Sequence, residues 1–347
     1  MPSVNQQLPK EISPNSTKLS HIILSLICPG IIFTLINLGA NYYLKYFPQN
    51  SGYWVIQQKW SMLLNLKQPV DWLILGDSSC NQGVIPEVLE TELSGESVNL
   101  CTIGDSLVLN DAWMLSKYIK KYGAPKNIVI VHVYDIWDRQ INWNVTSQIP
   151  LDWGYWYQLE PSLNLSIEEQ KTIFLNKYVP LYSQDTSLKE ILKNQETWFE
   201  SKGYKVSKDG FMAEEDSNSF NVEQDKKGHL KFVKKNPEFS LSEINKKSLQ
   251  TIVQLAEKHD INIYLANSPI YQELYLESSF QLYYNQVQKQ LKIISDRSKN
   301  FYYIMKEPMT FSKEEMENVD HLTVKAAKTY TKQLAKEIKQ QRVISKD

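Results

Sequence analysis

The chain has little of what several functional classes require. It contains only three cysteines in 347 residues, and its formal net charge is −1. Nucleic-acid binding depends on a basic surface, so this charge balance gives no electrostatic reason to expect a nucleic-acid partner. Hydrophobic residues make up 42% of the sequence. That fraction is ordinary for a globular protein, and the length allows one large domain with additional segments.

Charged residues are absent from His21 to Leu44, a segment dominated by isoleucine and leucine. A helix over this segment extends about 36 Å at about 1.5 Å per residue, and a bilayer core is about 30 Å thick. We therefore predict a cytoplasmic tail at 1–20, a transmembrane helix at 21–44 and a linker at 45–69. Tyrosines and a phenylalanine at 42–47 suit a membrane–water interface.

A buried globular helix and a cleaved signal peptide are the two alternatives to a membrane span for this segment. Its apolar character on all sides argues against the first. Its length, and the poor cleavage sequence Leu38-Gly39-Ala40, argue against the second. We favour an uncleaved, single-pass anchor that places the N-terminus in the cytoplasm and the following domain outside it. A soluble intracellular enzyme remains the alternative.

The three cysteines leave two possibilities open. Cys28 falls in the predicted span, whereas Cys80 and Cys101 follow the first two predicted strands and could approach each other. A disulfide between them is possible outside the cytoplasm, but we favour unpaired core residues.

From about residue 70, apolar strands alternate with amphipathic helices. Such alternation predicts a parallel sheet with helices on both faces, because each crossover helix packs on the sheet. The expected fold is an α/β three-layer sandwich, flavodoxin-like, with a five-stranded parallel sheet over 70–340. The predicted strands are 70–75, 97–102, 127–133, 261–266 and 301–305, and the predicted helices are 86–93, 110–122, 242–258, 280–295 and 323–339.

The pattern breaks at about 136–236, which we interpret as an insertion. Helix-like segments occur near 166–177 and 187–202, and 216–235 is polar enough for a mobile loop or small hairpin. Exposed aromatic side chains here could stack on sugar rings, although ordinary packing explains half or more of them. The tryptophans concerned are Trp137, Trp143, Trp153, Trp156 and Trp198.

Two residues at opposite ends of the α/β pattern suggest nucleophilic chemistry. Ser78 follows Gly76 and Asp77 at the end of the first predicted strand, and His321 follows Asp320 before the last helix. Serine nucleophiles need a base within hydrogen-bond reach, and that base is normally distant in sequence. The structural alternatives are a turn or helix-capping serine, and an Asp-His pair that caps a helix. His132, on a core strand, is expected to be a satisfied core residue.

These residues resemble the SGNH/GDSL esterase superfamily over roughly 70–340, apart from the insertion. The matching motifs are Gly76-Asp77-Ser78, Gly83-Val84-Ile85-Pro86 and Asp320-His321-Leu322-Thr323, with Gly104 after the second strand. The chain is most similar to membrane-anchored bacterial members that act on cell-surface polymers, such as alginate O-acetylation proteins and the D-alanine transfer protein of teichoic acid. The resemblance implies Ser78 as nucleophile, His321 as general base, and backbone N–H groups of Ser78 and Gly104 in an oxyanion hole.

The chain departs from the family pattern at three positions. The family's acid stands three residues before the histidine, where this chain has Asn318. Asp320 could substitute, or the site could work as a Ser-His dyad with Asn318 or a backbone carbonyl orienting the ring. The oxyanion asparagine of the third strand is missing, although Tyr134 offers a hydroxyl. Ala326 replaces a glycine of the last helix.

The resulting expectation is a membrane-anchored serine acyl-esterase or O-acyltransferase that acts on a cell-envelope glycan. Its site residues would be Ser78, His321 and Asp320 or Asn318, with Gly104, Asp77 and Tyr134 around the oxyanion and substrate. The resemblance implies no metal and no organic cofactor. It implies an acylated glycan or acyl donor as substrate and an integral membrane acyltransferase as partner. The alternative is a catalytically inactive member that binds glycan or scaffolds an export complex.

Overall fold

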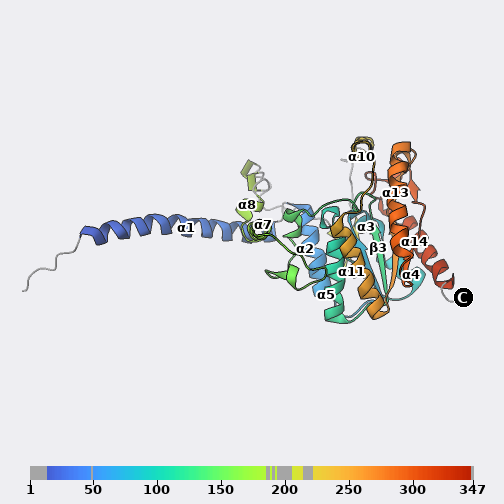
Figure 1. Cartoon of the computed structure of the whole chain (residues 1–347), viewed down its shortest axis with the longest axis horizontal. Coiled ribbons are helices and arrows are strands. Elements are labelled where there is room, and N and C mark those ends of the chain that lie inside the picture. The colour runs from blue at the N-terminus through green and yellow to red at the C-terminus, as the bar shows by residue number, and fades with distance from the viewer. Residues whose placement is uncertain are drawn as a thin grey trace, which may run out of the picture.

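The computed structural model describes residues 14–47, 50–184, 188–189, 192–193, 205–213 and 222–344. Its first element is the long helix α1 (Pro14–Tyr46), which extends away from the rest of the protein (Figure 1). Within α1, the segment Ile27–Tyr46 is long and apolar enough to cross a membrane, and only 6% of its most apolar window is buried inside the protein. The predicted apolar N-terminal helix is therefore present, and it lies outside the protein core.

The segment expected as a linker contains a helix, and this prediction is corrected. Helix α2 (Ser51–Leu64) is capped by Asn50, whose side chain accepts a hydrogen bond from the N–H of Tyr53. Its inner face buries Val55, Ile56, Trp60 and Leu63 in the main core. The folded domain therefore begins near residue 50 rather than 70, because these apolar side chains recur at helical spacing and pack on the domain.

Five parallel strands form the central sheet in the order β2-β1-β3-β6-β8. All five predicted strands are therefore present. The middle strands are buried on both faces, which explains their continuous apolar sequence. The strands are β1 (Trp72–Gly76), β2 (Ser97–Asn99), β3 (Asn127–His132), β6 (Asn262–Asn267) and β8 (Phe301–Tyr303).

The helices of the domain form two packed groups. Helix α5 packs on α2 and α11, and helix α14 packs on α3 and α4. Helix α13 lies between β6 and β8 in the chain and packs on β8 and on α10 (Val222–Lys235). Their bounds are α3 (Ser78–Gly83), α4 (Pro86–Leu93), α5 (Leu107–Tyr122), α11 (Glu243–His259), α13 (Ser278–Ser295) and α14 (Val324–Ile344).

The shorter elements complete the described structure. They include the two-stranded sheets β4 with β5 and β7 with β9. Their bounds are η1 (Gly104–Ser106), α6 (Trp143–Thr146), η2 (Tyr155–Tyr157), α7 (Ile167–Tyr178), α8 (Pro180–Ser183), β4 (Lys205–Val206), β5 (Met212–Ala213), β7 (Ile270–Tyr271), α12 (Gln272–Tyr275), β9 (Thr310–Phe311) and η4 (Lys313–Glu315).

The insertion differs from its prediction in one place. Helix α7 lies where a helix was predicted, but 216–235 is not a loop or hairpin, because its described part is the helix α10 (Val222–Lys235). Acidic residues in its first turn and lysines in its last turn complement the helix dipole, and Val222 and Val233 are buried. Most of the predicted helix 187–202, with Trp198, lies outside the described residues.

Candidate functional site

Ser78 lies at the carboxyl end of β1, at the first position of α3. Strand β1 has β2 on one side and β3 on the other. The chain therefore adds its next strands on opposite sides of β1, and the strand order reverses between β1 and β3. Ligands of open parallel sheets bind at the carboxyl ends of the strands next to such a reversal. Gly76 makes the turn possible, because its φ is +148° and an added Cβ would lie 2.0 Å from the carbonyl oxygen of Val131.

Asp77 is the N-cap of α3 and is almost fully buried. One carboxylate oxygen accepts hydrogen bonds from the backbone N–H and the hydroxyl of Ser79, at 2.9 and 2.6 Å. The other accepts the N–H of Val133 at 2.7 Å and lies 3.4 Å from Nδ1 of His132. The Asp77 carboxylate therefore fixes the turn that carries Ser78, and its oxygens are occupied inside the protein rather than offered to a substrate.

His132 connects Asp77 to a second buried carboxylate. Its Nε2 lies 2.6 Å from Asp111 and its Nδ1 lies on the Asp77 side, with all three side chains about 1% exposed. Burial lowers the pKa of His132, but the charges and hydrogen bonds of Asp111 and Asp77 outweigh it and raise this pKa to about 9. Burial likewise opposes ionisation of Asp77, yet His132, Ser79 and Val133 lower its pKa to about 2. His132 is therefore a satisfied core residue, as predicted, and is an imidazolium at neutral pH.

This buried imidazolium predicts a pH dependence of stability. The unfolded chain releases the His132 proton near pH 6.5 and the folded chain near pH 9, so folding stability falls as pH rises between these values. We expect the free energy of unfolding to fall by about 3 kcal/mol across this window. Urea unfolding of the full chain in detergent, from about pH 6 to about pH 9.5, measures this change. A His132→Asn variant is expected to show a lower but flatter profile, and an equally steep one would contradict the assignment.

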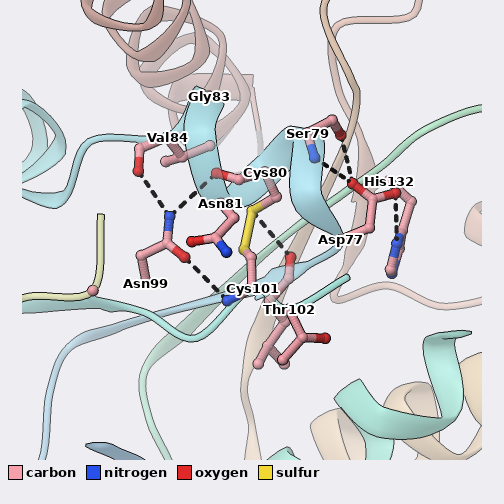
Figure 2. Close-up of a disulfide and its surroundings, with 12 residues drawn as sticks. Asp77, Ser79, Cys80, Asn81, Gly83, Val84, Asn99, Cys101, Thr102 and His132 are labelled. Carbon is pink, nitrogen blue, oxygen red and sulfur yellow. Dashed lines mark hydrogen bonds and ion pairs between the residues drawn. A yellow bond between two sulfur atoms is a disulfide. The ribbon is translucent and has the colours of Figure 1, made fainter. Parts of the chain in front are cut away.

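Cys80 and Cys101 form a disulfide, which corrects the preference for unpaired cysteines (Figure 2). Cys80 lies on α3, two residues after Ser78, and Cys101 precedes Gly104. Asn99 reinforces the link, because its amide nitrogen donates to the carbonyl oxygens of Cys80 and Val84. Spacing alone did not show the pairing, which depends on β1 and β2 being neighbours in the sheet. The disulfide ties the helix that begins with Ser78 to the segment that carries Gly104.

Removal of this disulfide is expected to destabilise the protein. The bond closes a loop with a sequence separation of 21 residues. Closing a loop of this size lowers the conformational entropy of the unfolded chain, which contributes about 3 kcal/mol to the free energy of unfolding. We expect the variant with both Cys80→Ser and Cys101→Ser to lose about this much free energy of unfolding. Cys28→Ser, which changes the exposed cysteine of α1, is the matched control and is expected to leave the unfolding midpoint unchanged.

His321 lies in the loop before α14, and Asn318 fixes the orientation of its ring. The amide oxygen of Asn318 accepts the backbone N–H groups of Asp320 and His321, at 2.9 and 2.8 Å. Its amide nitrogen must then face Nδ1 of His321, at 2.8 Å. In the neutral ring Nδ1 is therefore an acceptor, and the proton is on Nε2. This is the opposite tautomer to that of a serine-protease triad, where Nδ1 carries the proton.

The other ring nitrogen has no hydrogen-bond partner among the described residues. Nε2 of His321 is buried, and its nearest charged neighbour is a carboxylate oxygen of Asp320 at 3.8 Å. Burial raises the pKa of Asp320, with Asp77 and Asp135 adding to the effect and His321 opposing it. Of the two candidates for the residue that orients the ring, Asn318 contacts the ring directly and Asp320 lies beyond hydrogen-bond distance.

The structure brings the two ends of the chain to the same region. Helix α14, which follows His321, packs on α3, which begins with Ser78. The hydroxyl of Thr331 on α14 donates to the carbonyl of Gly83 and accepts the N–H of Ile85. The carboxylate of Asp77 is close enough to Asp320 to help raise the pKa of the Asp320 carboxyl. The turn that carries Ser78 and the loop that carries His321 therefore lie in the same region of the domain.

The other predicted site residues are already engaged by neighbouring groups. The hydroxyl of Tyr134 is hydrogen-bonded to Nδ1 of His229 at 2.7 Å, so it is occupied in this structure. Gly104 lies against Arg139, since an added Cβ would be 2.7 Å from its Nη1. The guanidinium binds Asp135 at 2.8 Å and Asp105 at 3.2 Å. The guanidinium beside Gly104 is therefore already paired with two carboxylates.

Sequence reasoning missed the partners of these residues. Asp111 is buried in α5, and nothing in its local pattern indicates that it faces His132. Arg139 offered one signal, its i,i+4 spacing to Asp135, but that spacing is common on polar segments. Among the described residues, no cluster of three or more His, Cys, Asp or Glu side chains could hold a metal ion. A surface groove between α11 and α13, lined by Phe239, Gln250 and Ile293, contains none of the site residues.

Comparison of the sequence with protein-family models gave no match, and comparison with curated proteins gave none.

Proposed function

We propose that the chain is a membrane-anchored acyl-esterase or O-acyltransferase of the SGNH type, with Ser78 as its nucleophile and a cell-envelope glycan as its substrate. The observation that carries this proposal is the position of Ser78. It begins α3 at the carboxyl end of β1, and α14, the helix preceded by His321, packs on α3. The five parallel strands and the two helix groups are consistent with a flavodoxin-like three-layer sandwich.

In the proposed reaction the Ser78 oxygen attacks the carbonyl carbon of an acyl ester. The Oγ–carbon bond forms, the hydroxyl proton passes to His321, and the alcohol leaves with that proton. Water or a sugar hydroxyl then attacks the acyl-serine and releases Ser78. Backbone N–H groups of Ser78 and Gly104 would stabilise the oxyanion.

The hydrogen bond from Asn318 makes His321 a poor general base for Ser78 in the natural chain. To accept the serine proton, Nε2 of His321 must first lose its own proton and Nδ1 must gain one, facing the amide nitrogen of Asn318. The expected wild-type activity is therefore slow. The same hydrogen bond favours a second candidate, a non-catalytic component that binds glycan or scaffolds an envelope complex.

The disulfide and α1 support an extracytoplasmic domain on a single-pass anchor. Structural disulfides persist in oxidising compartments and are rare in the cytosol. In this arrangement an integral membrane acyltransferase is the partner that would supply acyl groups. Neither a metal nor an organic cofactor has a role in the proposed chemistry.

The proposal is tested by incubating the full-length protein in detergent with p-nitrophenyl acetate and locating the acetyl group by peptide mass spectrometry after acid quench. The expected result is acetylation of the peptide that contains Ser78, and none in Ser78→Ala. If acetyl groups appear only on lysines, or equally in Ser78→Ala, the non-catalytic candidate is favoured instead.

A further inference from the structure

Exposed apolar side chains gather on one side of the insertion. We define the aromatic patch as Trp153, Tyr157, Ile167, Phe174 and Tyr178, which are between 37% and 82% exposed. Ile167, Phe174 and Tyr178 recur at seven and four residues, so they share a face of α7. Trp153 completes the group, with its ring 5.3 Å from that of Phe174 and 6.1 Å from that of Tyr178.

These aromatic residues are too exposed to be explained by packing alone. Trp137 and Trp156 are about 2% and 1% exposed, as ordinary packing of the insertion requires, whereas Trp153 is 43% exposed. The Phe174 side chain is 47% exposed, although it has no polar group that could form a hydrogen bond to water. A contiguous exposed apolar patch of this kind marks an interaction site.

The patch adjoins the helix that is apolar enough to span a membrane. The amide nitrogen of Asn37 on α1 donates to the carbonyl oxygen of Tyr178 at 2.8 Å, and α8 packs on α1. Figure 1 shows α7 and α8 beside the domain end of α1, while the rest of the helix extends away. Upstream of the contact, α1 exposes Ile31, Ile32 and Phe33, each by more than half.

This contact limits where the bilayer can lie. Hydrocarbon does not accommodate lipid-exposed irregular backbone such as the junction of α7 and α8, so the apolar core must end near Asn37. The last charged residue before the apolar segment is Lys18. The helical rise from Lys18 to Asn37 is about 28 Å, which matches a bilayer core of about 30 Å. Asn37 and Tyr178 are then at the membrane–water interface. The span is therefore shifted toward the N-terminus relative to 21–44 and to the apolar segment Ile27–Tyr46, and the part of α1 after Asn37 lies outside the hydrocarbon, beside the domain.

We propose that the aromatic patch rests in the interfacial layer of the bilayer that α1 spans, and so fixes the domain against the lipid surface. Tryptophan and tyrosine favour this layer, because their rings are apolar and their N–H and O–H groups reach water. The inference rests on the membrane-anchoring part of the proposed function and is independent of Ser78 chemistry. It assigns the exposed aromatic residues of the insertion to lipid rather than to sugar rings.

The test places single spin labels on the full-length protein in phosphatidylcholine–phosphatidylglycerol vesicles. In a Cys28→Ser background, Phe174→Cys and Trp153→Cys carry the label within the patch. Phe33→Cys is the lipid-exposed reference, and Leu282→Cys, 67% exposed on α13, is the matched control in water. Relaxation by lipid-soluble oxygen and by a water-soluble nickel chelate gives the depth of each label. Resistance of the protein to alkaline extraction confirms that α1 is inserted.

The expected result is an oxygen-to-nickel accessibility ratio at 174 and 153 that lies between those of 33 and 282. Ratios at 174 and 153 equal to that at 282 would overturn the inference. So would labels shielded from both reagents, which would indicate a protein partner, or labels whose nickel accessibility falls when an acetylated glycan is added. Failure of acyl transfer at Ser78 would leave these ratios unchanged, so the two proposals fail separately.

Discussion

Replacing Asn318 with aspartate is expected to raise the rate of acyl-ester hydrolysis by about a hundredfold to ten-thousandfold. One oxygen of the new carboxylate can keep the backbone N–H bonds that Asn318 makes to residues 320 and 321. The other then faces Nδ1 of His321, and a carboxylate there accepts a proton where the amide nitrogen now donates one. In a serine-protease triad the reverse change, aspartate to asparagine, costs about 10⁴ in kcat through the wrong tautomer.

The measurement is kcat/KM for p-nitrophenyl acetate in full-length Asn318→Asp and wild type. Asn164→Asp adds the same charge at an exposed position and is the matched control, with no change expected. The double variant Asn318→Asp/His321→Ala is expected to lose the whole gain, because the carboxylate acts only through the ring. An unchanged rate in a folded Asn318→Asp protein would mean that His321 does not serve as a base for this site.

Replacing Ser78 with alanine is expected to reduce the wild-type rate by about a hundredfold. Removal of a serine nucleophile costs about 10⁶ in kcat in an intact triad, and the wrong tautomer alone costs about 10⁴ of this. In the natural chain, which already has the wrong tautomer, removal of Ser78 can therefore lower the rate by only about a hundredfold. In the Asn318→Asp background the same Ser78→Ala change is expected to cost about ten-thousandfold to a millionfold, because the gain from aspartate is lost with the nucleophile.

Ser278→Ala is the matched control for Ser78→Ala, since Ser278 is an exposed serine at the first position of α13. Its rate is expected to equal that of wild type. Equal costs of Ser78→Ala in both backgrounds would show that Ser78 and Asn318 do not act in one mechanism. Unfolding midpoints of all variants separate loss of chemistry from loss of structure.

Much of the sheet was predictable from sequence because its strands are buried on both faces. Continuous apolar segments such as 127–133 are typical of parallel strands, and the intervening helices show their period clearly. Helices α2 and α10 were missed for the opposite reason. Their buried apolar residues recur at helical spacing, but they are few and lie among polar residues, so the local signal is weaker than that of the sheet.

The site was predictable only at the level of single motifs. Ser78 and His321 were found because a glycine turn after a strand and an Asp-His pair before a helix have local sequence patterns. The hydrogen bond from Asn318 to Nδ1, the Asp111–His132 pair and the Cys80–Cys101 bond join residues whose contact depends on tertiary structure or side-chain orientation. One sequence without the fold therefore gives the candidate nucleophile but not the protonation state of its partner.

The central claim is that Ser78 is a nucleophile, and a fluorophosphonate probe tests it most directly. The folded full-length protein is treated with the probe and digested, and the modified residue is located by mass spectrometry. The account predicts that Ser78 is the modified residue, that Asn318→Asp reacts faster, and that Ser78→Ala and denatured protein do not react. Modification of another residue, or none in folded Asn318→Asp, would contradict it.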